Sequence, residues 1–309
     1  MSTKLYISHH PVKGIITRAL TFPNQYSPNL IKNVLDILES YSIVIGNEFN
    51  FSDSITPNWF SSNLDINITL SKFSKLDTPS HIIRKHYSKL LELYPNYIQC
   101  FTDGSKIGQN HVGYAFSISD EFYSYKLNKI SSIFTAEILA VFHCLHHIST
   151  NLSHYPSKNF VIITDSLASL TSLKKVFPTN LVSKHMQSLT HKLFLLQSNI
   201  KFIYAPSHIG ILGNDKVDSL AKSSALESPF NFPLISDLHS LIEKHIQNNW
   251  QTEWQGSQQK LGAIKKSVLP WKNFAFTNRS EEVAITRLRI GHSRITHKHL
   301  FQKNFDPPE

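Results

Sequence analysis

Four consecutive apolar residues at positions 160–163, Phe-Val-Ile-Ile, constrain the fold of this chain more than any other feature. Such a run, ending in the Thr-Asp pair at 164–165, is typical of a β-strand buried on both faces. Further β-type runs occur at 97–101, 112–118, 122–127 and 201–204, and helical patterns at 134–148, 167–175, 181–196 and 214–225. The order β-β-β-α-β-α-α-β-α predicts an α/β fold with a five-stranded mixed sheet flanked by helices.

The character of the sequence changes twice along its 309 residues, which predicts three segments. Residues 1–95 are predicted to form a helical connecting segment, in which Pro28 and Pro79 mark the starts of two helices. The Ser/Asn/Asp-rich stretch between these helices is predicted to be a loop that could include one short strand. Residues 96–226 form the α/β domain. Residues 227–309 form a mostly helical, basic C-terminal extension, with helices expected at 238–254 and 282–290.

Composition limits the environment and the partners of the chain. The formal net charge of +9 and a pI near 9.4 suit a polyanionic partner such as a nucleic acid. No apolar run has the length of a membrane span, and the N-terminus has no signal-peptide core, so we expect no membrane partner. Only Cys100 and Cys144 are present, which excludes a disulfide framework and predicts an intracellular location, cytoplasmic or nuclear.

Acidic residues are scarce in the α/β domain, and their positions are informative. Residues 97–226 contain seven, of which Asp120 and Glu121 occupy an expected hairpin tip. Asp103 and Asp165 each follow a strand, whereas Glu137 is expected in the first turn of the long helix and Asp218 one turn into the last one. Carboxylates at the carboxyl ends of neighbouring strands converge on one edge of a sheet.

Converging carboxylates repel one another unless a cation neutralises them. Ligands that are all oxygen favour a hard divalent ion, Mg²⁺ or Mn²⁺. A pair of such ions can activate a water molecule and stabilise the leaving 3′-oxygen during phosphodiester hydrolysis, with Asp103 as the natural bridging ligand. Taken singly, each of these acids could instead be an ordinary helix cap or turn residue. Their order and context favour the metal site.

Four stretches carry a family resemblance. Residues 102–105 (Thr-Asp-Gly-Ser), 136–137 (Ala-Glu), 164–166 (Thr-Asp-Ser) and 207–222 (Ser-His-Ile-Gly-Ile-Leu-Gly-Asn-Asp-Lys-Val-Asp-Ser-Leu-Ala-Lys) resemble the type 1 ribonuclease H family, over about 130 residues. The resemblance implies a ribonuclease H-like fold and two Mg²⁺ ions, replaceable by Mn²⁺. The implied activity is endonucleolytic hydrolysis of the RNA strand of RNA–DNA hybrids to 5′-phosphomonoesters. The residues that match the family's catalytic and metal-binding carboxylates and its loop histidine are Asp103, Glu137, Asp165, Asp218 and His208.

His208 also stands out from its surroundings, because it lies in a loop flanked by Pro206 and Gly210, and a histidine can exchange protons near neutral pH. Ser105 and Asn214 are candidates for contacts with the RNA 2′-hydroxyl or backbone. His143, His146 and His147 could form a metal pair, but a polar helix face is the better interpretation. Six lysines are candidates for phosphate contacts: Lys106, Lys174, Lys175, Lys184, Lys192 and Lys222.

The two flanking segments resemble parts of non-LTR retrotransposon polyproteins, which implies that the chain is a retrotransposon-derived fragment. No cysteine follows Cys144, so the zinc-binding segment usual in those polyproteins is not predicted. The basic C-terminal tail is a candidate for contact with other nucleic acid. The alternative function is a non-catalytic, nucleic-acid-binding remnant of a mobile element. A transposase or integrase is disfavoured because those enzymes lack the block from His208 to Lys222.

Overall fold

The computed structural model describes residues 36–37, 39–40, 56–62, 64–74, 77–230, 233–256, 265–269 and 278–289. The chain divides into two compact units, Met1–Leu238 and His239–Glu309. Most of the helix expected near Pro28 and the basic stretch up to Lys303 lie outside the described residues.

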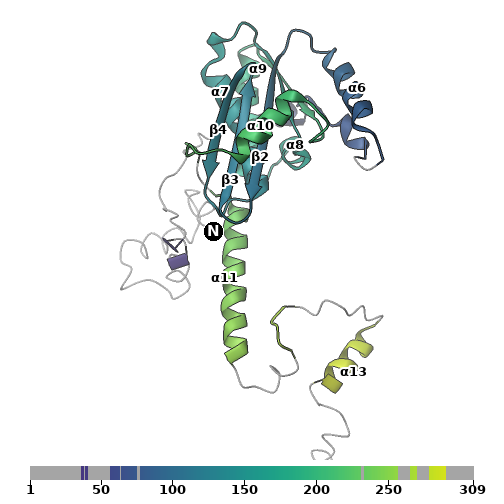
Figure 1. Cartoon of the computed structure of the whole chain (residues 1–309), viewed down its shortest axis with the longest axis vertical. Coiled ribbons are helices and arrows are strands. Elements are labelled where there is room, and N and C mark those ends of the chain that lie inside the picture. Colours follow the sequence, from purple (N-terminus) through teal and green to yellow (C-terminus); the bar gives the residue numbers. More distant parts are fainter. Residues whose placement is uncertain are drawn as a thin grey trace, which may run out of the picture. The chain divides into compact units, whose positions relative to one another are not determined.

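The first unit is built on a six-stranded mixed sheet with the order β1-β6-β5-β2-β3-β4 (Figure 1). Strands β2, β3 and β4 form an antiparallel meander, whereas β5 is parallel to β2, β6 to β5 and β1 to β6. The strands are β1 (Ile66–Asn67), β2 (Ile98–Ile107), β3 (His111–Ile118), β4 (Glu121–Leu127), β5 (Asn159–Thr164) and β6 (Asn199–Tyr204). The predicted α/β mixed sheet is confirmed, with one strand more than expected, because two residues of the N-terminal segment pair with β6.

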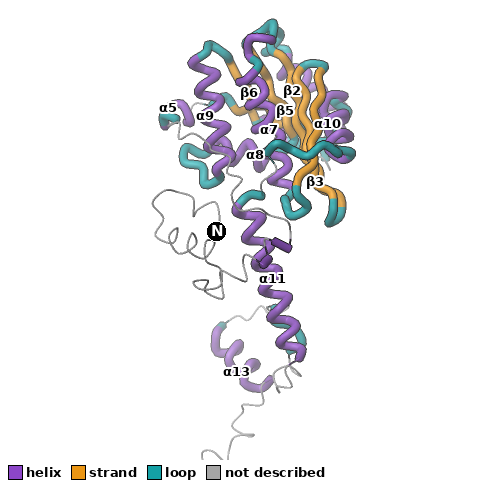
Figure 2. The backbone as a smooth tube through the Cα atoms, turned by 90° about the vertical axis from the view of Figure 1, so that its left-hand side faces the viewer, coloured by secondary structure: helices purple, strands orange, loops and turns teal. Residues whose placement is uncertain are grey.

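Helices cover both faces of the sheet because its central strands are apolar on both sides. On β5, Phe160 and Ile162 enter one core cluster, and Val161 and Ile163 enter the other. The first cluster packs beneath three helices and the second beneath two, and Figure 2 shows α7, α8 and α9 on one side of the strands and α10 on the other. The helices are α6 (Ser80–Leu91), α7 (Ile133–Thr150), α8 (Leu167–Lys174), α9 (Leu181–Leu195) and α10 (Leu212–Lys222).

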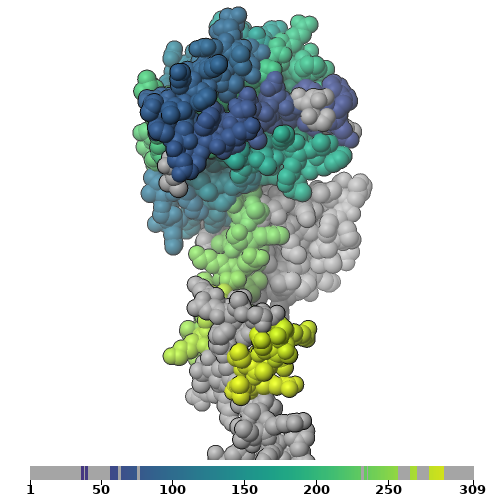
Figure 3. Space-filling view, turned by 90° about the vertical axis from the view of Figure 1, so that its right-hand side faces the viewer, coloured from purple at the N-terminus to yellow at the C-terminus, as the bar shows by residue number. Residues whose placement is uncertain are grey.

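The segment before the sheet domain packs onto it. Ile83 and Tyr87 of α6 are buried in the same cluster as Ile203 of β6 and Ile209 of the following loop. Helix α6 forms part of the outer surface of this unit (Figure 3, dark blue). Residues of the N-terminal segment are therefore part of the same hydrophobic core as the sheet. The short elements nearby are α5 (Asn58–Ser62), η1 (Thr69–Lys72) and η2 (Leu152–His154).

Two further helices are described, α11 (Ile235–Gly256) and α13 (Arg279–Arg289). Helix α11 begins in the first unit, where Leu234 and Leu238 are buried. Among the described helices, α7 alone is long and apolar enough to cross a membrane, and 61% of its apolar window is buried inside the protein. Its apolar character is accounted for by its position in the core.

Candidate active site

The parallel pairing of β2 and β5 brings two carboxylates together. Thr102 of β2 is in register with Thr164 of β5. The next residue of each chain segment, Asp103 and Asp165, is therefore at the same height in the sheet, and the two residues are neighbours. The sequence pattern predicted that the first strand ends at Asp103, but β2 continues to Ile107. It continues because the antiparallel partner β3 pairs with it over its whole second half. Asp103 is therefore held within a strand and not in a turn.

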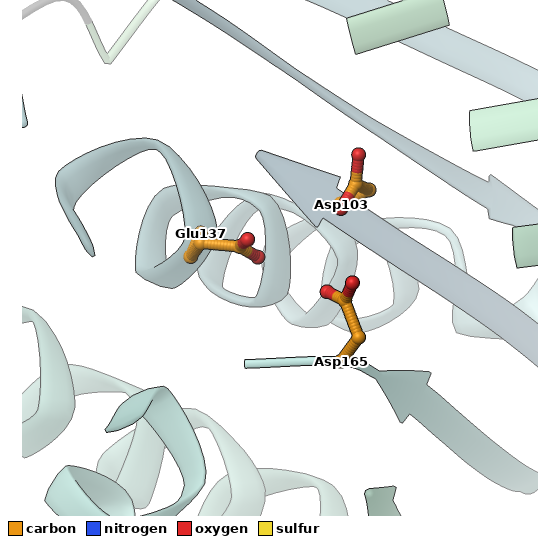
Figure 4. Close-up of side chains that lie close together, drawn as sticks. All are labelled: Asp103, Glu137 and Asp165. Atoms are coloured by element: carbon orange, nitrogen blue, oxygen red, sulfur yellow. The ribbon is translucent and has the colours of Figure 1, made fainter. Parts of the chain in front are cut away.

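Glu137 reaches the same place from α7. It lies one residue beyond the first helical turn, in which we had predicted it. Oxygen atoms of Asp103, Glu137 and Asp165 lie within 4.8 Å of one another, and Figure 4 shows the three side chains converging from a strand, a helix and the end of a second strand. This acidic cluster could hold a metal ion.

Gly104 allows the strand and the helix to approach this closely. A Cβ atom at residue 104 would lie 2.4 Å from the backbone nitrogen of Glu137 and 2.7 Å from the carbonyl carbon of Ala136. No side chain fits in that space. The backbone N–H of Gly104 also donates a hydrogen bond to the Glu137 carboxylate, which favours its charged form.

The cluster is electrostatically unfavourable when its carboxylates are all charged. Burial, and then the charges of Asp165 and Asp218, raise the pKa of Asp103 to about 8. Burial is also the main reason why the pKa of Glu137 lies well above its usual value, followed by the charges of Asp165 and Asp103. Oδ2 of Asp103 and Oε2 of Glu137 are buried without a hydrogen-bond partner among the described residues. Buried, unpaired carboxylate oxygens are the donors that a hard cation requires.

Asp218 approaches the cluster from α10. It is close enough to Asp103 to raise the pKa of that carboxyl group, but it is not one of the three residues whose oxygens meet within 4.8 Å. Its Oδ2 accepts a hydrogen bond of 2.6 Å from Nζ of Lys222. Gly213 lets α10 lie close to the sheet, since a Cβ there would meet the ring of Phe101 at 2.3 Å. Asp218 lies nearly two turns into this helix, not one, because α10 begins at Leu212.

The remaining predicted site residues lie on the same elements. Ser105 follows Asp103 by two residues on β2, so the two side chains share one face of the sheet. Asn214 precedes Asp218 by one helical turn on α10, and its buried Oδ1 has no hydrogen-bond partner in the described part of the chain. His208 is exposed in the turn after β6, with a positive φ of 58°. The roles of these residues stay predictions.

Two of the lysines expected to bind phosphate also make contacts within the protein. Nζ of Lys106 donates to the carbonyl oxygen of Ser131 at 2.7 Å, and Lys222 is paired with Asp218. Sequence reasoning missed one positive group, Arg84 of α6. Its guanidinium lies beside the loop that carries His208, since a Cβ at Gly210 of that loop would be 2.8 Å from Nη1 of Arg84. More than a hundred residues separate the two positions, and no local pattern connects them.

Of the three clustered histidines of α7, His143 does not belong to the expected polar face, whereas His146 and His147 are half-buried. His143 is buried, and its Nδ1 lies 2.9 Å from the hydroxyl of Tyr114. Burial lowers the pKa of His143 to about 3, so its ring is neutral. The rings of Phe116, Tyr125 and Phe230 surround it. The sequence did not anticipate this arrangement because those aromatic side chains come from three other segments.

A comparison with protein families identifies the region that carries the cluster. Residues 95–226 match the model of the RNase H family. The match supports a ribonuclease H domain. All four predicted carboxylates and His208 lie within it, and the predicted ribonuclease H-like fold is confirmed with six strands in place of five. No curated protein matches the chain significantly.

Several solved structures are similar to part of this chain. RNase H1 from the halophilic archaeon Halobacterium salinarum NRC-1 is 15% identical, with 42% of this chain and 97% of that chain covered and a TM-score of 0.32. LC11-RNase H1, isolated from compost by a metagenomic approach, is 18% identical, with coverages of 42% and 95% and a TM-score of 0.33. LC11-RNase H1 in complex with an RNA/DNA hybrid is 15% identical, with coverages of 41% and 95% and a TM-score of 0.32.

Proposed function

We propose that this protein is an endonuclease that hydrolyses the RNA strand of RNA–DNA hybrids and leaves 5′-phosphomonoesters. The observation that carries the proposal is the cluster of Asp103, Glu137 and Asp165 within a region that matches the RNase H family. A basic chain with a net charge of +9 suits a double-stranded polyanion as substrate. A neighbouring fold, LC11-RNase H1, has been solved with an RNA/DNA hybrid bound.

The cofactor that we propose is a pair of Mg²⁺ ions, with Mn²⁺ as a substitute. Asp103, Glu137, Asp165 and Asp218 would hold them, and the buried, unpartnered oxygens of Asp103 and Glu137 fit a hard cation. When bound, divalent cations supply an activated water molecule and stabilise the leaving 3′-oxygen. Asp103 is the proposed shared ligand, because its pKa responds to both Asp165 and Asp218.

The other site residues would orient the substrate and move protons. Ser105 and Asn214 would donate hydrogen bonds to the RNA backbone or to its 2′-hydroxyl, the group that distinguishes RNA from DNA. His208, exposed in its turn, would take up or release a proton as the product leaves.

Cleavage of a labelled hybrid tests this function. With Mg²⁺, the full chain should cut the RNA strand of an RNA–DNA duplex and leave duplex DNA of the same sequence intact. The Asp165→Asn variant should lose at least about 10²-fold in rate, because a metal ligand loses its charge. The matched control is Asp120→Asn, the same change at an exposed hairpin position, which should cut at the wild-type rate.

Three outcomes would contradict the proposal. Normal hybrid binding without cleavage would support a non-catalytic remnant instead. Equal cleavage of hybrid and duplex DNA would contradict the specificity for RNA. Wild-type activity of Asp165→Asn would contradict the ligand assignment.

The proposed origin is a non-LTR retrotransposon, with residues 1–95, 96–226 and 227–309 as connecting segment, nuclease and basic extension. The support is the resemblance of the flanking sequences to the segments around the nuclease of such polyproteins. We also propose that the basic tail contacts nucleic acid. A measurement of hybrid affinity with and without residues 290–309 tests the latter, and an unchanged dissociation constant would contradict it.

A further inference from the structure

After the family match ends at residue 226, the described residues 227–230 and 233–238 pack back onto the same unit; we call them the C-terminal strap. Glu227 forms a parallel bridge with Lys126 of β4, and Lys126 exchanges backbone hydrogen bonds with Leu226 and Ser228. Figure 1 shows the chain after α10 crossing the sheet toward β4. Because β4 is the edge strand, the strap covers backbone groups that the edge would otherwise expose.

Beyond this edge the strap packs against α7. Phe230 and Leu234 belong to the core cluster beneath α7, whereas α10 packs on the other cluster. The ring of Phe230 lies 5.0 Å from that of Phe142 and 4.6 Å from that of His143, both on α7. The strap therefore passes from one face of the sheet to the other and is anchored along the helix that carries Glu137.

The strap ends in a buried carboxylate at the N-terminus of α7. Oδ1 of Asp237 accepts a hydrogen bond from the backbone N–H of Ser132 at 3.2 Å, and Oδ2 accepts from Oγ1 of Thr135 at 2.6 Å. Oδ2 also accepts from the backbone N–H of Leu234 at 3.1 Å. Ser132 is the N-cap of α7 and its own hydroxyl accepts from Thr135. A negative charge here also interacts favourably with the helix dipole.

The first turn of α7 is thus held from two sides. Asp237 accepts hydrogen bonds from the N-cap and the third residue of the helix, and Gly104 lies against the helix backbone where the first turn ends, at Ala136 and Glu137. Glu137 follows Thr135 by two residues, so a shift of the turn moves its carboxylate relative to Asp103. We propose that Asp237 is a positioning residue for Glu137, acting through the first turn of α7. The expected effect of Asp237 on catalysis rests on the proposed nuclease function, whereas its expected effect on cation binding does not.

Titration with Mn²⁺ in the absence of nucleic acid tests the inference. The EPR signal of free Mn²⁺ reports binding by the full chain. Residues that orient metal ligands commonly change metal affinity by about 10–100-fold when replaced. We therefore expect about 10-fold weaker Mn²⁺ binding for Asp237→Ala and a smaller loss for Asp237→Asn, which keeps one acceptor oxygen. The matched control is Glu243→Gln, an exposed carboxylate on α11, which should bind Mn²⁺ as the wild type does.

Two additional measurements separate positioning from general destabilisation. Thr135→Val removes the hydroxyl that donates to Asp237 and also contacts the Ser132 hydroxyl, and it should weaken Mn²⁺ binding in the same direction, even if Asp237→Ala does not fold. Hybrid cleavage should show a lower kcat with an unchanged KM, because Asp237 is not among the residues proposed to contact the nucleic acid. A positioning role predicts these changes at temperatures well below the melting transition of each variant.

The outcomes are distinguishable from a failure of the proposed function. If the wild type cleaves hybrids and both Asp237→Asn and Thr135→Val bind Mn²⁺ with wild-type affinity, the positioning role is wrong although the nuclease function holds. If the wild type does not cleave but Mn²⁺ affinity still depends on Asp237, the nuclease function fails and the positioning role holds.

Discussion

Replacing Gly104 with alanine should move Glu137 of α7 away from Asp103 and Asp165. The new Cβ would lie 2.4 Å from the backbone nitrogen of Glu137, whereas ordinary contacts of a Cβ begin at 3.4 Å. The first turn of α7 must therefore move by about 1 Å, because the opposing atoms are backbone and cannot rotate away. A misplacement of about 1 Å can cost on the order of 10²-fold in rate. The same overpacking should destabilise the fold by about 1–3 kcal/mol.

Single-turnover cleavage of a labelled hybrid, together with urea unfolding, measures both effects of Gly104→Ala. The matched control is Gly256→Ala, since no atom lies within 4 Å of a Cβ at that position. The control should cleave like the wild type and unfold within about 0.5 kcal/mol of it. If Gly104→Ala cleaves within about 3-fold of the wild type while folded, then the closeness of β2 and α7 is not what aligns the carboxylates.

Further predictions concern charge, cation and proton transfer. Because the pKa of Asp103 is raised from 3.8 to about 8, the metal-free protein should lose stability as the pH rises from about 4 to 8, by at most about 6 kcal/mol. Asp103→Asn should flatten that dependence in urea unfolding, and an unchanged slope would contradict the raised pKa. Mg²⁺ at about 100 times its dissociation constant should stabilise the wild type by about 2.7 kcal/mol. Asp165→Asn should show little of this gain in a thermal melt. His208→Ala should lower kcat by about 10²-fold with KM unchanged, and a kcat within 2-fold of the wild type would exclude a role in proton transfer.

The parts of the fold that were predictable are those with a local signal. The run at 160–163 is typical of a buried strand, and its alternate residues do enter two different cores. The carboxylates could be placed because parallel strands end at one sheet edge, and β2 and β5 are in the register that this requires. The family-like block around His208 added Asp218, whose proximity to Asp103 no periodicity would have indicated.

The parts that could not be predicted depend on contacts between distant segments. The sequence left room for one short strand between the two predicted helices of residues 1–95 but could not place it, because β1 has only two residues, too few for an alternating pattern, and forms by pairing with β6. Asp237 looks like an ordinary acid in the first turn of α11, and only the packing of the strap places its carboxylate at a second helix. His143 looked like part of a polar stripe, because sequence spacing does not reveal that Tyr114 and Phe230 enclose it.

The raised pKa of Asp103 also constrains how a cation would enter the site. Near neutral pH the metal-free cluster retains a proton, because its carboxylates cannot all be charged while they are buried together. A cation that binds must therefore displace that proton, so its apparent affinity should rise with pH up to about 8. The backbone brings these carboxylates together, since Asp165 directly follows β5, which is in register with β2, and Gly104 lies against the backbone of Glu137. The fold thus brings together carboxylates whose mutual repulsion a divalent cation would relieve, and the backbone arrangement that gathers them matters to the cluster as much as the acids themselves.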